Sequence, residues 1–113
     1  MTASTPDTSG STTNHWIADN QQLAALCEQL QPSTSLAIDT EFMRTNTYYP
    51  KLALIQLSDG QQCWLIDVLE IDQFAPLKAL LEAPDRVLIF HAPGEDFEVL
   101  DHVLSIVPVN IFD

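Results

Sequence analysis

The chain has 113 residues, 46% of them hydrophobic, and 4 basic against 16 acidic side chains give it a formal net charge of −12. This composition predicts one globular domain, and no apolar run approaches the roughly 20 residues of a membrane span, so we expect no membrane-spanning helix. The acidic balance excludes a protein that grips a phosphate backbone over a wide basic surface. It leaves open a nuclease in which metal ions or a basic partner neutralise phosphate locally.

The chain divides into a tail and a domain. Residues 1–14 are rich in Ser and Thr and predict a disordered tail, and 15–113 predict a partial domain. Asp19 fits a helix N-cap with Gln22 as its capping-box partner, and Pro32 ends that helix. The first helix is therefore expected directly after the tail, apart from a possible short edge strand.

The remaining elements alternate between strands and helices. Asp59-Gly60 is a turn signal between two apolar segments and predicts a hairpin. The order predicts an α/β fold with a mixed five-stranded sheet and flanking helices. Because the last predicted element is a strand, we expect one sheet face to lack its covering helix and the chain to be part of something longer. The predicted strands cover 36–42, 52–58, 63–67, 86–91 and 109–112, with a possible edge strand at 16–18, and the predicted helices cover 72–81, capped by Asp72, and 94–104.

The cysteines give information on the compartment. Cys27 and Cys63 lie inside patterned segments and lack the spacing of metal ligands. They indicate small buried side chains in a reducing environment, which favours a cytoplasmic location, although a disulfide between them stays open.

The strand predicted over 36–42 ends in two acids on the same face. Strand side chains alternate, so Asp39 and Glu41 point one way and Thr40 the other. Adjacent carboxylates repel each other, and a hard cation such as Mg²⁺ or Mn²⁺ between them removes the repulsion. The simpler interpretation is two acids facing water. An Asp-x-Asp phosphatase and an Asp-Thr-Gly aspartic protease both fail, because Glu41 replaces the residue that each requires.

A third acid is predicted to face the same end of the sheet. Asp96, Leu100, Val103 and Leu104 share one helical stripe, so Asp96 is turned toward the sheet. If the strand 86–91 lies parallel to the central strand, the start of this helix faces the acid pair, at the edge where α/β sheets bind ligands. Alone, Asp96 also fits an acid that satisfies free N–H groups of the first helical turn.

Several segments together resemble one known family. The resemblance spans 16–113 and is to the ribonuclease D family, DEDD-type 3′→5′ exonucleases with a ribonuclease-H-like fold. The run at 44–50 is its most specific part. The segments that carry it are 39–42 (Asp-Thr-Glu-Phe), 44–50 (Arg-Thr-Asn-Thr-Tyr-Tyr-Pro), 54–57 (Leu-Ile-Gln-Leu), and His91 with Asp96 five residues later.

The resemblance implies a reaction and a substrate. Asp39, Glu41 and Asp96 would be catalytic residues that hold two divalent ions, Mg²⁺ or Mn²⁺. One ion would activate water and the other would stabilise the leaving 3′-oxygen. The expected activity is removal of nucleoside 5′-monophosphates from RNA 3′ ends, including those of tRNA precursors and other structured RNAs.

Further substrate contacts are expected near these acids. Phe42, Arg44, Tyr48 and His91 are the candidates, although loop aromatics also pack under loops and a strand-end histidine is often a satisfied structural residue. The third family motif, a Tyr three residues before an Asp, has no counterpart here, and the C-terminal helices of the family are missing. An inactive fragment that binds nucleic acid or a partner is therefore the alternative function.

Overall fold

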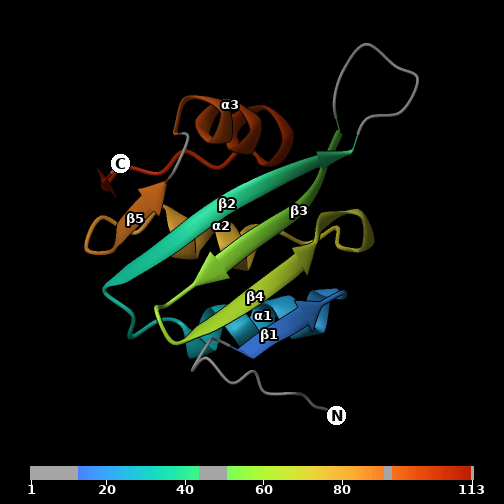
Figure 1. Cartoon of the computed structure of the whole chain (residues 1–113), viewed down its shortest axis with the longest axis horizontal. Helices are drawn as coiled ribbons and strands as arrows, with labels where there is room; N and C mark the ends of the chain where they lie inside the picture. Colours follow the sequence, from blue (N-terminus) through green and yellow to red (C-terminus); the bar gives the residue numbers. More distant parts are fainter. Residues whose placement is uncertain (1–12, 44–50, 91–92, 113) are drawn as a thin grey trace.

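The computed structural model describes residues 13–43, 51–90 and 93–112 (Figure 1). Residues 1–12 of the predicted tail lie outside the described residues. The first strand begins at Thr13, so the last two residues predicted as tail belong to a strand. The elements in order are β1 (Thr13–Ile17), α1 (Asn20–Gln29), β2 (Ser35–Met43), β3 (Lys51–Ser58), β4 (Gln62–Asp67), the 3₁₀ turn η1 (Val68–Glu70), α2 (Ala75–Leu81), β5 (Val87–Phe90), α3 (Pro93–Leu104) and β6 (Ile111–Phe112).

The strands form one mixed sheet in the order β1-β4-β3-β2-β5-β6. The α/β class is confirmed, but the sheet has six strands where five were predicted, because the possible edge strand forms and pairs in parallel with β4. The strands β3 and β4 form the predicted hairpin, with Asp59 Oδ1 accepting from the Gln61 and Gln62 amides and Gly60 at φ 93°. The parallel pairing of β5 with β2 is confirmed.

The helices cover one face of the sheet. Leu36, Ile38 and Thr40 of β2 are buried, whereas the alternate residues Ala37 and Asp39 are only half-buried. In Figure 1 α1 and α2 lie behind the strands, and α3 reaches the same face, where Phe97 packs against Phe90 of β5. Over the described ranges the opposite face has no helix on it, which agrees with the expected half-covered sheet. No helix in these ranges is long and apolar enough to cross a membrane.

The caps of the first two helices illustrate local and tertiary control. Asp19 accepts a hydrogen bond from the Gln22 amide at 2.7 Å, so the predicted N-cap is confirmed. The Gln22 side chain also reaches back, but it accepts from the amide of Ala18, one residue before the cap, at 2.8 Å. The predicted cap of α2 was wrong, because Phe74 occupies the N-cap position. Asp72 instead accepts a hydrogen bond from the Asn20 side chain at 2.8 Å, a contact between distant segments.

The inward face of α3 also differs from the prediction at one position. Asp96 and Leu100 are buried and Leu104 is half-buried against the core, as their shared stripe predicts. Val103 is 51% exposed, so the last turn contacts the core through Leu104 instead.

One buried cation joins three parts of the chain. Arg86 is 4% exposed and donates from Nε to the Ser33 carbonyl, from Nη1 to the Leu80 carbonyl and from Nη2 to the Gln31 carbonyl, at 2.7 to 2.9 Å. These bonds satisfy the guanidinium with backbone oxygens and fix the loop before β2 against the end of α2. Burial raises the pKa of the nearby Cys27 thiol to about 11, against the lowering effect of the Arg86 charge.

Removing this cation should cost stability. Arg86→Met leaves carbonyl oxygens without donors in a buried region, and we expect the free energy of unfolding to fall by about 3 kcal/mol. Urea denaturation followed by circular dichroism measures the change. Lys51→Met, which removes an exposed cation of β3, is the control and should shift it by less than about 0.5 kcal/mol. Equal effects of the two substitutions would contradict the role given to Arg86.

The two cysteines report on the two sheet faces. Cys27 is buried in α1, whereas Cys63 is half-buried on the uncovered face, and burial raises the pKa of both thiols. Because the thiolate is the reactive form, iodoacetamide should alkylate Cys63 at least about tenfold faster than Cys27, with rates that rise from pH 7 to 9. Mass spectrometry of native and urea-unfolded protein measures this. Equal native rates would show that the uncovered face is not accessible.

Candidate active site

The predicted acid pair lies at the end of β2 on the uncovered face. Thr40 is buried under α3, so Asp39 and Glu41 on either side of it point the other way. Asp39 is half-buried and its Oδ1 accepts a hydrogen bond from the Thr40 amide at 3.0 Å, while Glu41 is exposed. The two carboxylates thus share a face, as the alternation predicts.

Asp96 reaches the same end of the sheet from the other side of β2. The parallel pairing of β2 and β5 puts the start of α3 beside the carboxyl end of β2. Thr40 Oγ1 donates to Asp96 Oδ1 at 2.5 Å, although 56 residues separate them in the chain. Asp96 is 3% exposed. The third acid therefore contacts the residue that lies between the first two.

A β-bulge marks this end of β2. Glu41 pairs with Leu54 and Phe42 pairs with Leu52, so Ala53 is the extra residue of β3. Bulges redirect side chains and are common beside active sites. Phe42, a predicted substrate contact, is half-buried directly after the bulge. The sequence gives no sign of the bulge, because β3 is apolar almost throughout. In the structure, the buried residues Leu52 and Ile55 are three positions apart, which breaks the strand period of two.

A small hollow opens beside Asp39 on the uncovered face. Its volume is about 150 Å³, and Gln56, Ser58 and Cys63 contribute to its lining with Asp39. Gln56 is the cross-strand partner of Asp39 in β3, so its amide and the carboxylate occupy the same face. In the sequence, Gln56 is recognisable only as part of the family motif at 54–57.

The donor set suits a hard divalent cation. Asp39, Glu41 and Asp96 offer only carboxylate oxygens, the ligands that Mg²⁺ and Mn²⁺ prefer. Within the described residues, however, no three His, Cys, Asp or Glu side chains are grouped as ligands of one ion. The reason is that Asp39 and Glu41 lie on the uncovered face, whereas Asp96 bonds Thr40 on the covered face. Convergence of the three acids on metal stays a prediction.

The other predicted substrate contacts cannot be placed. Arg44, Tyr48 and His91 all lie outside the described residues. Of the four candidate contacts, Phe42 alone has a position in the fold.

The comparisons with known proteins identify the family. The profile of the 3′-5′ exonuclease family matches residues 14–113, and the chain belongs to that family. Its fold matches the crystal structure of Escherichia coli RNase D with a TM-score of 0.83 and 43% identity, covering 90% of this chain and 27% of that one. The catalytic core of RRP6 from Trypanosoma brucei also gives a TM-score of 0.83, at 27% identity over 91% of this chain and 29% of that one.

Among curated proteins the chain is similar to ribonucleases D. It is 46% identical over 97 residues to Ribonuclease D of Cronobacter turicensis and 45% identical over 97 residues to Ribonuclease D of Escherichia coli. Each match covers 86% of this chain and 26% of the relative. The chain thus spans about a quarter of the length of these relatives. The resemblance inferred from the motifs is confirmed.

The bond between strand and helix can be tested by an isosteric change. Thr40→Val removes the hydroxyl donor to the buried Asp96 carboxylate, and we expect the free energy of unfolding to fall by about 2 kcal/mol. Differential scanning calorimetry measures it. Ser35→Ala, at an exposed position of the same strand, serves as the control. A loss below about 0.5 kcal/mol for Thr40→Val would mean that this bond does not fix α3 on β2.

Proposed function

We propose that this chain carries part of the active site of a divalent-metal-dependent 3′→5′ exoribonuclease. The observation that supports it most is the position of three acids at one end of β2 in a member of the 3′-5′ exonuclease family. Fold alone does not specify chemistry, so the proposal depends on Asp39, Glu41 and Asp96 rather than on the sheet.

Asp39, Glu41 and Asp96 would together hold two divalent metal ions, either Mg²⁺ or Mn²⁺. Bound there, such ions supply an activated water and stabilise the leaving 3′-oxygen of the phosphodiester. Thr40 orients the Asp96 carboxylate by its hydrogen bond, and Gln56 lies across from Asp39 where it can donate to a carboxylate or to the substrate. The expected product is a nucleoside 5′-monophosphate.

The substrate we propose is the 3′ end of an RNA, including tRNA precursors. The similar Escherichia coli RNase D is described as an exoribonuclease involved in structured RNA processing. The net charge of −12 repels a phosphate backbone, so grip on the RNA must come from the metal and from a basic surface outside the described residues. We expect the protein to act in the cytoplasm.

One observation favours a second candidate, a module that binds nucleic acid or a partner without cutting. The acids are not grouped as ligands of one ion in the described residues. A protein that keeps the fold and lacks a complete metal site would look the same at Asp39, Glu41 and Asp96. Hydrolysis therefore has to be measured directly.

The acid pair gives the decisive substitution. We expect Asp39→Asn, made in the full-length protein, to lower the rate of 3′→5′ hydrolysis by about a hundredfold or more. Metal sites lose roughly 10- to 100-fold in metal affinity or activity even when only the outer partners of the ligands are changed. A 5′-labelled RNA with Mg²⁺ or Mn²⁺, resolved on a denaturing gel, measures it.

The fold should survive this substitution, since removing one of two repelling charges costs the metal-free protein little. Glu98→Gln, at an exposed acid of α3, is the matched control and should cleave normally. An undiminished rate in Asp39→Asn would sink the metal mechanism, and no hydrolysis in the unsubstituted protein would favour the binding module.

A further inference from the structure

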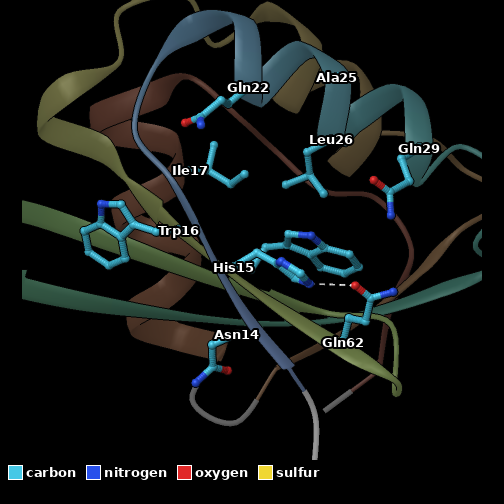
Figure 2. Close-up of a pocket in the computed structure, with 10 residues that line it drawn as sticks. Asn14, His15, Trp16, Ile17, Gln22, Ala25, Leu26, Gln29 and Gln62 are labelled. Atoms are coloured by element: carbon cyan, nitrogen blue, oxygen red, sulfur yellow. Dashed lines mark hydrogen bonds between the residues drawn. The ribbon is translucent and has the colours of Figure 1, made fainter. Parts of the chain in front are cut away.

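A second hollow lies far from the candidate acids, between α1 and the strands β1 and β4 (Figure 2). Its volume is about 520 Å³, within the range of small-molecule sites. Of the two strands that line the hollow, β4 is separated from β2 by β3, and β1 lies beyond β4 at the edge of the sheet. The buried Trp64 of β4 places the hollow on the helix-covered face. It is therefore a separate site, which does not depend on the metal.

The hollow has an apolar floor and a polar rim. Ile17, Leu26 and Trp64 are buried and form the floor. Asp, Glu, Lys and Arg are all missing from the described residues that line the hollow. Trp16 is also adjacent, but Figure 2 shows its ring pointing away from the hollow. The rim carries the amides of Gln22, Gln29 and Gln62 and the imidazole of His15, whereas Asn14 lies on the same side of β1 as Trp16 (Figure 2).

The imidazole forms a flat platform over the floor. The His15 ring stacks on the Trp64 ring with centroids 6.0 Å apart and an angle of 24° between the planes. His15 Nε2 lies 2.7 Å from Gln62 Oε1, which holds the ring in this orientation. Because Trp64 is 3% exposed and His15 is half-buried, a second flat ring would stack on the open side of His15.

The helix supplies space and amides opposite this platform. Gln22, Ala25, Leu26 and Gln29 lie at i, i+3, i+4 and i+7 of α1 and so share one stripe that faces β1. The small Ala25 side chain leaves the space open. Gln22 Oε1 already accepts from a backbone amide, whereas the Gln29 side chain has no hydrogen bond to the described residues, so its carbonyl and its NH₂ group are both available.

We propose that this hollow binds an uncharged planar nitrogen heterocycle, a nucleobase presented by a nucleoside or by an unpaired nucleotide of RNA. Stacking on an aromatic pair together with Gln amides that read the base edge is how proteins recognise unstacked bases. Neither Lys nor Arg is among the described residues that line the hollow, so a phosphate would find no permanently charged cation there. A free nucleoside should therefore bind better than its 5′-monophosphate.

Trp64 fluorescence tests the proposal in the whole chain. With Trp16→Phe as the background, Trp64 is the sole remaining tryptophan and lies in the floor of the hollow. Adenosine, uridine, adenosine 5′-monophosphate and a short unstructured oligoribonucleotide are titrated without divalent metal, so failure of the metal mechanism does not affect the result. We expect saturable binding of nucleoside, and weaker binding of the monophosphate.

Two variants locate the binding. His15→Ala removes the platform and should weaken nucleoside binding about fivefold or more, in line with the contribution of one base stack. Ala25→Phe fills the hollow from an exposed helix position and should abolish binding without unfolding the chain. His102→Ala, an exposed histidine of α3, is the control and should bind like the background.

The outcomes separate the sources and the failures. Saturation by adenosine alone identifies a nucleoside site, and saturation by the oligonucleotide as well identifies an RNA site. No saturable binding, or tighter binding of the monophosphate than of adenosine, overturns the proposal. Unchanged nucleoside affinity in Ala25→Phe also overturns the proposal. If circular dichroism shows that His15→Ala is unfolded, the Ala25→Phe result alone decides between the outcomes.

Discussion

The hydrogen bond from Thr40 to Asp96 sets the relation between the strand and the helix that carry the candidate acids. This bond holds α3 on the covered face of β2 at Thr40, the residue that lies between Asp39 and Glu41 of the uncovered face. The parallel pairing of β2 with β5 makes the contact possible, because it brings the start of α3 to the carboxyl end of β2. A metal site at this end would thus draw ligands from both sides of one strand.

The one-sided sheet explains why the two hollows differ. On the covered face, the helices bury the core and leave a hollow at the sheet edge beside His15, lined by apolar and amide side chains. On the uncovered face, half-buried polar groups such as Gln56 and Asp39 share a smaller hollow. Arg86 joins the loop before β2 to the end of α2 by donating to three carbonyls, two in the loop and one in the helix, a role that leaves it unavailable for phosphate.

The sequence predicted the features that depend only on residues close together in the chain. The N-cap at Asp19, the hairpin turn at Gly60 and the shared face of Asp39 and Glu41 all follow from short-range rules. The sequence predictions failed where contacts between distant segments matter. Asp72 accepts a hydrogen bond from Asn20 and does not cap α2, and the edge strand β1 forms by pairing with β4. The bulge opposite Glu41 and the contact of Asp96 with Thr40 are likewise products of strand pairing and helix packing.

The central claim is that Asp39, Glu41 and Asp96 form one divalent-metal site. Electron paramagnetic resonance of Mn²⁺ titrated into the protein, with Asp96→Asn beside Glu98→Gln, tests it most directly, because bound Mn²⁺ loses its free-ion signal. We predict that the unsubstituted protein and Glu98→Gln bind Mn²⁺ alike, and that Asp96→Asn weakens binding about tenfold or more. Equal binding in Asp96→Asn would show that the helix acid is a structural partner of Thr40 and would contradict the account.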